Sequence, residues 1–394
     1  MIDRIVSTIA TVSGAIAVCS LGYYVLCLFG AARFLGQRKA AGEGARPTPT
    51  LAPLPPVSIL KPLKGTDPEM YESFRSHCLQ DYPEYEIVFG VSDADDPAIA
   101  FVERLQAEFP QVPIRLLRCL KNLGANTKVS NLAQMVTEAK YEHMVVNDSD
   151  IRVEPDYLRS VTAPLLDPKI GLVTCLYRGV ASPSLGSRLE SLSISTDFSA
   201  GVLVARLIEG GIRFGLGSTL AFRRRELEAS GGFEALVDYL ADDYEMGRRI
   251  AERGLKVQLS AVVVETFLPA YTLRQFVDHQ LRWGRTVRDS RRWGYLGLVA
   301  TFGVPWASGA VLLTRGAPGA WALLAVALGL RVAVALSVGW SILRDRQVFS
   351  LLPSLPLRDF VALLVWFASL LGNKVVWRGE AFKLKNGRLV RIGS

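Results

Sequence analysis

The chain has 394 residues, half of them hydrophobic, and a formal net charge of +8. This length allows two or more domains, or one large domain together with membrane segments. The apolar content argues against a purely soluble protein. The five cysteines are scattered, without the spacing of a zinc site or a disulfide framework. No basic stripe interleaved with aromatic residues indicates nucleic-acid binding, whereas the positive charge suits anionic lipid and a phosphorylated substrate.

Residues 1–36 predict a transmembrane anchor. The run from Ile5 to Ala32 contains no charged residue and is long enough to cross a hydrocarbon core of about 30 Å. A cleaved signal peptide has a shorter apolar region, and here basic residues follow at once, beginning with Arg33. Because positive residues stay on the cytosolic side, we expect the next domain to face the cytosol.

Residues 293–376 predict further membrane segments. Their uncharged runs are Trp293–Thr314, Gly316–Leu343, interrupted by Arg331, and Phe360–Asn373. The last run is short for a spanning helix, which favours a re-entrant or interfacial segment. Three crossings in total would leave the basic tail, residues 377–394, in the cytosol. Arg331 either faces protein or reaches a lipid headgroup.

A linker and one large domain are predicted between these membrane regions. Residues 37–56 are rich in Pro, Gly and Ala, as expected of a linker. From residue 57 to about residue 270, short apolar runs alternate with helical patterns. This alternation predicts an α/β domain with a mostly parallel sheet covered on both faces, in which ligands bind beyond the carboxyl ends of the strands.

Acidic residues follow two of the predicted strands. Asp93 follows "IVFGVS", and Asp148 and Asp150 follow "HMVVN". In a continuing strand, Asp148 and Asp150 would point the same way. Two such carboxylates repel each other, which a Mg²⁺ or Mn²⁺ ion bridging to substrate phosphates would relieve. The alternative is a solvated Asp-rich turn that caps the next helix.

Two later segments complete the pattern. In "YLADDYEMGRRIAERG", Asp242 is expected to be a helix N-cap and Asp243 a first-turn charge, unless the pair acts chemically. Residues 271–292 predict an amphipathic helix on the membrane surface, rich in arginines that face lipid or clamp a diphosphate. These arginines are Arg274, Arg282, Arg285, Arg288, Arg291 and Arg292.

The order of these features resembles the membrane-bound GT-A glycosyltransferases, and within them the ceramide glucosyltransferase-like family, glycosyltransferase family 21. The matching blocks are "VSILKPLKGTDP", "LQDYPEYEIVFGVSDADDPAI", "NTKVSNL", "NDSDIRVEPD", "GLVT", "GGFEAL" and "ADDYEMGRRIAERG". The resemblance implies a Rossmann-like GT-A domain, which binds a nucleotide-diphospho-sugar, with transmembrane helices at both ends of the chain.

The family's roles are carried over residue by residue. The resemblance makes Asp93 the contact to uracil or ribose, Lys128 a lysine near the nucleotide, and Asp148 and Asp150 the ligands of a divalent cation, Mg²⁺ or Mn²⁺. By the same resemblance Asp243 is the catalytic base. The family's (Q/R)xxRW motif, which contacts the nucleotide-sugar, falls on His279, Arg282 and Trp283.

Two positions depart from the family pattern. His279 stands where Gln or Arg is usual, with Gln280 as a neighbouring substitute. Phe198 lies about where the ceramide enzymes carry a His. The stretches "LVARLIEGGIRFGLGSTLAFRR" and "HQLRWGRTVRDSR" look closer to the bacterial hopanoid branch of the family.

The expected function is therefore inverting, metal-dependent transfer of a sugar, N-acetylglucosamine, from a UDP-sugar to a lipid hydroxyl. The expected acceptor is bacteriohopanetetrol, and ceramide glucosylation is the alternative. A polysaccharide synthase would need more spanning helices, and a non-catalytic scaffold would not need every acid. The expected location is the bacterial inner membrane, as a multi-pass protein with a cytosolic catalytic domain.

Overall fold

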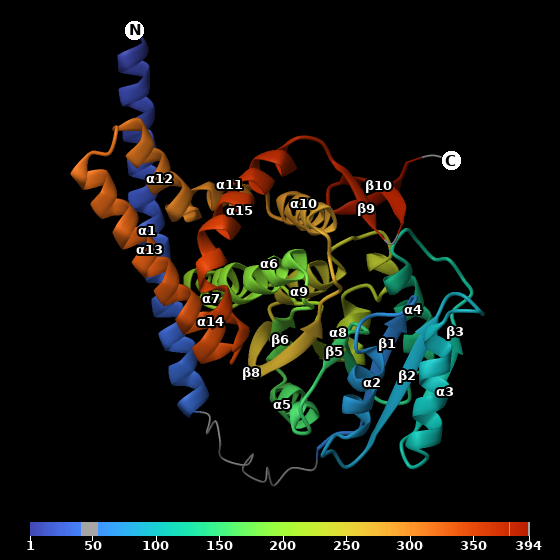
Figure 1. Cartoon of the computed structure of the whole chain (residues 1–394). Helices are drawn as coiled ribbons and strands as arrows, with labels where there is room; N and C mark the ends of the chain where they lie inside the picture. Colours follow the sequence, from blue (N-terminus) through green and yellow to red (C-terminus); the bar gives the residue numbers. More distant parts are fainter. Residues whose placement is uncertain (41–53, 378, 393–394) are drawn as a thin grey trace. The chain divides into compact units, whose positions relative to one another are not determined.

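The computed structural model describes residues 1–40, 54–377 and 379–392 (Figure 1). Two compact units are formed, a sheet unit and a helical unit, and each collects segments distant in sequence. The sheet unit comprises Gly42–Val180, Glu209–Pro269 and Trp377–Ser394, and the helical unit comprises Met1–Ala41, Ala181–Ile208 and Ala270–Val376. Most of the predicted linker, residues 37–56, lies outside the described residues.

The sheet unit is built on an eight-stranded mixed sheet of order β3-β2-β1-β4-β7-β6-β8-β5. Its strands are β1 Val57–Leu63, β2 Tyr85–Val91, β3 Ile114–Arg118, β4 His143–Val146, β5 Ile151–Arg152, β6 Ile170–Val180, β7 Leu220–Arg223 and β8 Lys256–Phe267. β1 pairs in parallel with β2 and β4, and β2 with β3, while β7 runs antiparallel to β4 and β6. The predicted Rossmann-like α/β fold is confirmed.

Helices connect these strands, as the alternating pattern predicted. They are α2 Met70–Cys78, α3 Ala98–Glu108, α4 Thr127–Glu138, α5 Tyr157–Thr162, η1 Ala163–Leu166, α8 Arg224–Ala229, η3 Glu234–Leu236 and α9 Asp242–Glu252. Every residue of β1 is buried, as expected of an apolar strand covered on both faces. α4 packs against β1 and β2, and its first turn is fixed by the side chain of Asn126, which accepts a hydrogen bond from the Val129 N–H.

The basic segment 377–394 is folded where it is described, rather than being a simple tail. After β9 Lys374–Trp377, strands β10 Glu380–Lys385 and β11 Arg388–Arg391 form an antiparallel hairpin. Asn386 and Gly387 connect them with positive φ angles of 53° and 76°, the backbone that an Asn-Gly turn provides. Alternation along β10 buries Phe382 and Leu384.

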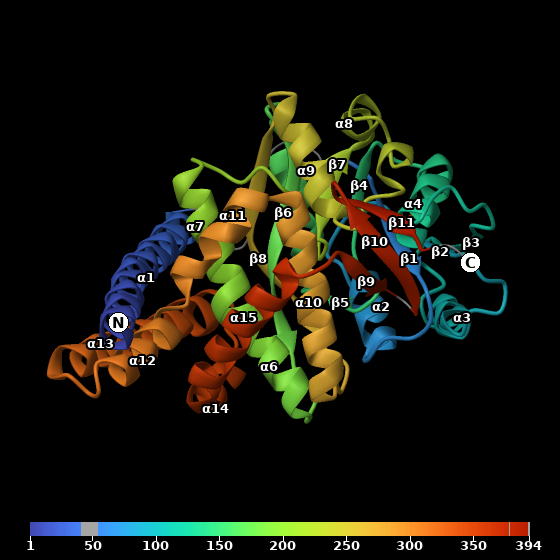
Figure 2. The ribbon, with the colours of Figure 1, turned by 90° about the horizontal axis from the view of Figure 1, so that it is seen from above.

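The helical unit consists of long apolar helices and shorter connecting turns. Its elements are α1 Ile2–Ala40, α6 Leu185–Ser193, η2 Ile194–Phe198, α7 Ser199–Ile208, α10 Leu273–Ser290, α11 Arg292–Gly297, η4 Leu298–Thr301, α12 Gly303–Leu313, α13 Pro318–Val334, η5 Ala335–Ile342, α14 Gln347–Leu351, η6 Leu352–Ser354 and α15 Leu355–Leu370. α12 and α13 pack against α1, as Figure 2 shows. Buried Ala17, Ala307 and Ala327 allow the close approach of these three helices.

Among the described residues, four helices are long and apolar enough to cross a membrane, and a bent pair makes a fifth candidate. They are Ile2–Ala40, Leu185–Ile208, Pro318–Ile342 and Gln347–Leu370, with the pair Arg292–Thr301 and Gly303–Leu313 bent by 51°. The run Phe360–Asn373 seemed short because its helix already begins at Gln347, before the charged residues Arg358 and Asp359. Those charges are buried inside the protein, so they do not end the helix.

Arg331 faces protein, which decides between its two predicted environments. Its Nε donates to both carboxylate oxygens of Asp359 at 3.0 Å, and the side chain is fully enclosed. The segment Ala181–Ile208 also differs from the predicted continuous domain 57–270, because it packs with the helical unit. Its apolar helix shares the buried interior of that unit instead of covering the sheet.

Candidate active site

The candidate site lies at the carboxyl edge of the parallel strands in the sheet unit. β1 is flanked in parallel by β2 and β4, so the segments following these strands leave the sheet at the same edge. Asp93 follows β2, and Asp148 and Asp150 follow β4. The strand arrangement therefore delivers both predicted acidic segments to one side of the sheet.

Asp148 and Asp150 lie in a turn, not in a continuing strand. β4 ends at Val146, so strand alternation does not orient the two carboxylates, and that expectation was wrong. The turn is fixed instead by buried Asn147, whose amide donates to the Ser218 carbonyl at 2.7 Å and the Tyr157 hydroxyl at 2.8 Å. Asn147 thus holds the acidic turn beside the segment before β7.

Lys128 lies at the centre of a cluster of carboxylates. Its Nζ is 2.8 Å from Asp148 Oδ1 and 3.4 Å from Asp242 Oδ2. Burial alone would lower the pKa of Lys128, but the surrounding carboxylates, Asp148 foremost, raise that pKa above its ordinary value. Lys128 is therefore a fixed positive charge, close to the Asp148 position as the sequence predicted.

A second lysine, Lys61, was not anticipated as part of the site. It lies on β1, is completely buried, and donates from Nζ to the Asp148 carbonyl oxygen at 3.0 Å. Burial lowers its pKa to about 7, against the opposing charges of Asp150 and Asp148. A lysine within an otherwise apolar strand, "VSILKPL", was the available sequence signal, because such a charge is rarely buried without a partner.

Asp150 is more enclosed than Asp148. Its Oδ2 accepts a short hydrogen bond from the Thr266 hydroxyl on β8. Burial, followed by the charge of Asp148, raises the pKa of Asp150 to about 6. Asp148 keeps 41% of its side-chain surface exposed, so it is the more accessible of the two carboxylates.

Asp242 and Asp243 have different environments at the start of α9. The N-cap is Ala241, so the prediction of Asp242 as the N-cap was wrong. Asp242 is buried, pairs with Lys128, and lies 3.5 Å from the Asn126 amide. Asp243 is half-buried, and its Oδ1 accepts from the Tyr244 N–H at 2.7 Å. Burial and then the charge of Asp242 raise the pKa of Asp243 to about 6.

Two glycines bring Asp243 close to Asp148. Gly247 lets α9 touch the neighbouring loop, since a Cβ there would lie 2.3 Å from the Gly215 backbone nitrogen. At Gly217 in that loop, a Cβ would lie 3.2 Å from Asp148 Oδ2 and 3.3 Å from Asp243 Oδ2. The two carboxylate oxygens therefore face the same small space, which glycine leaves open.

This donor set suits a hard divalent cation that also binds a substrate. No group of three or more His, Cys, Asp or Glu side chains forms a metal cage within the part of the chain that the structure describes. Mg²⁺ typically uses one or two carboxylates together with phosphate and water oxygens, so a full cage is not required. Accessible Asp148, with Asp150 two residues later, fits such a two-carboxylate site.

Asp93 and Asp96 divide the roles that the sequence left open for the acids after β2. Asp96 is buried and accepts hydrogen bonds from the Gly65 and Ala98 N–H groups, so it fixes the loop. Asp93 is exposed, and its Oδ1 accepts from the Asp95 N–H at 3.0 Å. Asp93 is therefore the acid of this loop that is open to a ligand.

The predicted residues His279, Arg282 and Trp283 belong to the helical unit. They lie on α10, an amphipathic helix that begins with a capping box formed by Thr272 and Gln275. His279 Nδ1 is 3.1 Å from Glu190 Oε1, and the Gln280 amide donates to Glu190 Oε2 at 2.7 Å. The Trp283 ring packs edge-on against Phe198, with 5.5 Å between centroids.

Two of the α10 arginines have structural partners. Arg288 Nη1 donates to the Gly372 carbonyl at 2.8 Å, and Arg285 Nη2 donates to the Leu371 carbonyl at 3.2 Å. These carbonyls follow the end of α15, where basic side chains satisfy free acceptors. Arg285 and Arg288 therefore stabilise a helix end, which neither predicted role, lipid contact or diphosphate clamp, had included.

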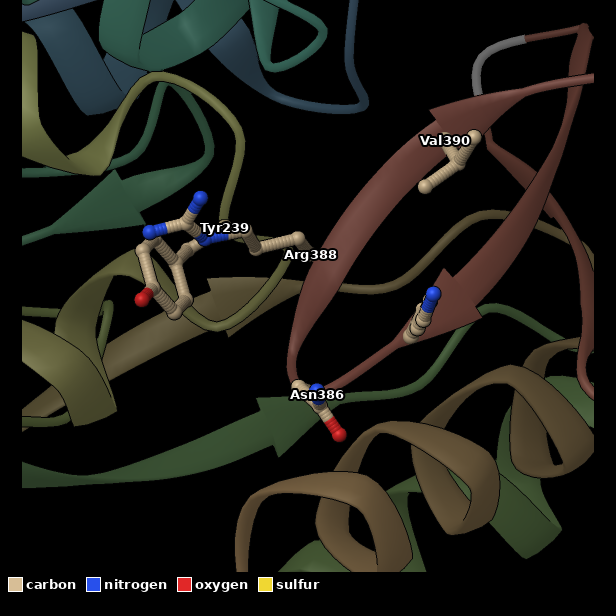
Figure 3. A pocket seen from close by; sticks show the side chains of 5 residues that line it. Tyr239, Asn386, Arg388 and Val390 are labelled. Carbon is tan, nitrogen blue, oxygen red and sulfur yellow. The ribbon is translucent and has the colours of Figure 1, made fainter.

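A pocket of about 380 Å³ opens where the C-terminal hairpin meets the loop preceding α9 (Figure 3). It is lined by Tyr239, Lys385, Asn386, Arg388 and Val390. The Arg388 guanidinium lies 5.2 Å from the centre of the Tyr239 ring. The Tyr239 carbonyl in turn accepts from the Asn126 amide at 2.7 Å, so the hairpin supports the loop that leads to Asp242.

Solved structures support the fold. A mannosyltransferase from Pyrobaculum calidifontis, solved in complex with GDP-Man and Mn²⁺, superposes with a TM-score of 0.50 at 20% sequence identity. The match covers 90% of this chain and 99% of that one. At this identity the similarity shows the shared GT-A fold.

Sequence relatives carry one activity name. Ceramide glucosyltransferase 1 of Caenorhabditis elegans is 24% identical over 363 residues, which cover 88% of this chain and 74% of that protein. Ceramide glucosyltransferase 3 of the same organism is 28% identical over 231 residues, covering 58% of this chain and half of that protein. The family model of glycosyl transferase family 21 matches residues 12–390. The chain is therefore a member of glycosyl transferase family 21, a family of sugar-transferring enzymes.

Proposed function

We propose that the protein transfers a sugar, with inversion, from a UDP-sugar to the hydroxyl of a membrane lipid. The observation that carries this proposal is the shared space at Gly217, which the Oδ2 atoms of Asp148 and Asp243 both face. A carboxylate at this place lies beside the acidic turn that would hold a donor diphosphate. The lone Lys128 within the same cluster supplies positive charge for the donor.

Asp243 is the proposed general base. Its Oδ2 accepts the proton of the acceptor hydroxyl while the hydroxyl oxygen forms a bond to the anomeric carbon. The bond from that carbon to the diphosphate breaks at the same time, and the electron pair leaves with the nucleoside diphosphate. Because attack and departure occur on opposite faces, the configuration inverts. A pKa near 6 keeps Asp243 deprotonated at neutral pH yet basic enough to accept a proton.

The donor contacts follow from the same cluster. Asp148 and Asp150 would hold Mg²⁺ or Mn²⁺, which when bound offsets the negative charge of the diphosphate. Lys128 would contact the nucleotide after exchanging part of its ion pair with Asp148, and exposed Asp93 would bind the uracil or ribose. Arg282 and Trp283, with His279 in the first motif position, would complete the donor site.

His279 has a defined tautomer in this proposal. A donated hydrogen bond from Nδ1 to the buried carboxylate of Glu190 leaves Nε2 as the nitrogen that would meet the nucleotide-sugar. Gln280, the other candidate for the motif's first position, uses its amide on the same Glu190. His279 is therefore the better candidate for a ligand contact.

The acceptor lipid has two candidates. The relatives are named ceramide glucosyltransferases, which favours ceramide with UDP-glucose over the expected bacteriohopanetetrol. Phe198, where the ceramide enzymes carry a His, is the observation that keeps the hopanoid polyol and an N-acetylglucosamine donor as a second candidate. Anchoring through the apolar helices, with the sheet unit in the cytosol of a bacterial inner membrane, completes the proposal.

The test is in vitro transfer by the purified full-length protein. UDP-glucose and UDP-N-acetylglucosamine are each offered with ceramide and with bacteriohopanetetrol, in the presence of Mg²⁺ or Mn²⁺, and lipid products are identified by mass spectrometry. A hexosylceramide product would support the first candidate, and a glycosylated hopanoid the second. Absence of any glycolipid from an active, folded preparation would contradict lipid transfer.

A further inference from the structure

A buried ionic network runs through the helical unit, far from the chemistry assigned above. Arg331 on α13 donates from Nη2 to Asp359 on α15 at 2.9 Å and to Asp197 on η2 at 2.5 Å. The neighbouring Arg358 is 4% exposed, and its Nη2 lies 3.4 Å from Asp197 Oδ2. Arg358 Nη2 also donates to the Gln280 side chain at 2.9 Å. Four segments therefore meet at these two arginines.

The charges of this network are balanced. Two arginines, Arg331 and Arg358, face two aspartates, Asp197 and Asp359. Burying charged groups among apolar helices is costly unless each is paired, so the balance explains how the network is tolerated. An additional anion at this place would lack a partner, whereas an uncharged polar group would not disturb the balance.

Several polar atoms of the network are nevertheless left without a hydrogen bond. Within the part of the chain that the structure describes, Arg358 Nε and Nη1, Asp197 Oδ2 and Ser199 Oγ are buried and have no hydrogen-bond partner. Ser199 is completely buried at the start of α7. Native proteins leave few buried polar atoms unsatisfied, so a group of them on three adjoining segments indicates a ligand or a bound water.

The backbone at this place is also unusual. Residues Ile194–Phe198 form a π-helical turn directly before Ser199, and a second π-helical segment, Ala335–Ile342, follows α13 and contacts the first. Such turns are rare and occur frequently at functional sites. Asp197 keeps 34% of its side-chain surface exposed, so the network reaches the surface of the helical unit at this residue.

We propose that Arg358, Asp197 and Ser199 bind the uncharged polar head of the acceptor lipid. The guanidinium donates to a hydroxyl or amide oxygen of the lipid, Asp197 accepts from a hydroxyl or amide hydrogen, and Ser199 can do either. The apolar surfaces of the surrounding helices suit the lipid's hydrocarbon. This inference rests on the proposed function, because it names the site of the lipid that receives the sugar.

The experiment measures lipid binding, not turnover, with the full-length protein in detergent. The probes are a short-chain ceramide, which is uncharged and carries hydroxyl and amide groups, and its 1-phosphate, which is anionic. Wild-type protein is expected to bind the ceramide more tightly than the phosphate. Tighter binding of the phosphate would overturn the charge argument and with it the proposed ligand class.

Two serines of the same helical run provide matched variants. Ser199→Ala removes a hydroxyl without a protein partner, so the melting temperature should stay equal or rise. Its dissociation constant for ceramide should increase about three- to tenfold, the effect of one hydrogen bond. Ser195→Ala removes a hydroxyl that donates to buried Asp345 at 2.7 Å, so it should lower the melting temperature and leave ceramide affinity unchanged.

The results separate this site from the proposed function. Unchanged ceramide affinity in Ser199→Ala would mean that the hydroxyl meets a buried water only, and the site would be wrong even if sugar transfer occurs. The predicted contrast between the two serine variants, in a protein that transfers no sugar to ceramide, would retain the lipid site and refute the transferase proposal for this lipid.

Discussion

The two units handle buried charge in opposite ways. In the sheet unit, Asp148, Asp242 and Asp243 gather around one lysine, Lys128, which leaves an excess of negative charge. In the helical unit, Arg331 and Arg358 are matched by two aspartates. Both arrangements take charged side chains out of water, but only the second neutralises them within the protein.

This difference indicates what each unit is prepared to bind. An excess of carboxylates raises the free energy of the empty protein and is relieved by a cation, as expected where a metal-bound diphosphate belongs. A balanced network with unmatched hydrogen-bonding atoms accommodates an uncharged polar group. The comparison thus separates a site for a charged donor from a site for a neutral acceptor.

The largest expected effect comes from the proposed base. Asp243→Asn should lower kcat by about 10²- to 10⁴-fold, the usual contribution of a general base. Its melting temperature should be unchanged or higher, because burial and the Asp242 charge disfavour the ionised carboxylate. The control, Asp242→Asn, removes the Lys128 partner and should act mainly on the KM for the UDP-sugar. A kcat for Asp243→Asn within a few-fold of wild type would refute the assignment.

Breaking the balanced network should damage stability instead. Arg331→Met leaves Asp359 and Asp197 without their main cation, which should destabilise the fold by about 3–5 kcal/mol. Adding Asp359→Leu removes one of the orphaned charges and should restore part of that loss. Thermal unfolding in detergent measures both. If the double variant is less stable than Arg331→Met, the account of a charge-balanced pair is wrong.

The pH dependence of transfer tests the excess of acid in the sheet unit. Since the pKa of Asp243 is raised to about 6, the base is ionised above that pH and becomes protonated below it. We expect kcat/KM to fall as the pH drops through about 6, approaching tenfold for each further unit. A profile that stays flat down to pH 4.5 would contradict Asp243 as the group that accepts the proton.

The smallest predicted effect concerns the space between the two carboxylates. In Gly217→Ala the new methyl group would press on Asp148 and Asp243 oxygens at 3.2 and 3.3 Å. These are side-chain contacts that can yield, so we expect a modest loss of kcat/KM, about three- to tenfold, with little change in stability. Gly211→Ala, where a Cβ meets nothing within 4 Å, is the control. Equal activity of the two variants would argue against a ligand at Gly217.

The sequence predicted the sheet edge well because its signals are local. Apolar runs such as His143–Val146 end at acids, and strand–helix alternation decides which ends share an edge. The sequence also contained an Asn-Gly pair within an alternating pattern, which is a recognisable hairpin signal for β10 and β11, although the segment was predicted as a tail.

The buried networks were not predictable in the same way. Arg331 and Asp197 are 134 residues apart in sequence, and Arg331 and Asp359 are 28 apart, so no local pattern links them. Lys61 has the same difficulty, because its partner Asp148 comes from another strand. Pairing that depends on which elements pack together becomes visible only when the fold is known.

The central claim is that the carboxylate excess of the sheet unit holds a divalent cation with the donor diphosphate. Calorimetric titration of UDP into the full-length protein, with Mn²⁺ or with a chelator, tests it most directly. We predict that removing the cation weakens UDP binding by more than about tenfold, and that Asp148→Asn in Mn²⁺ does the same. Equal affinity for UDP with and without the cation would contradict the account.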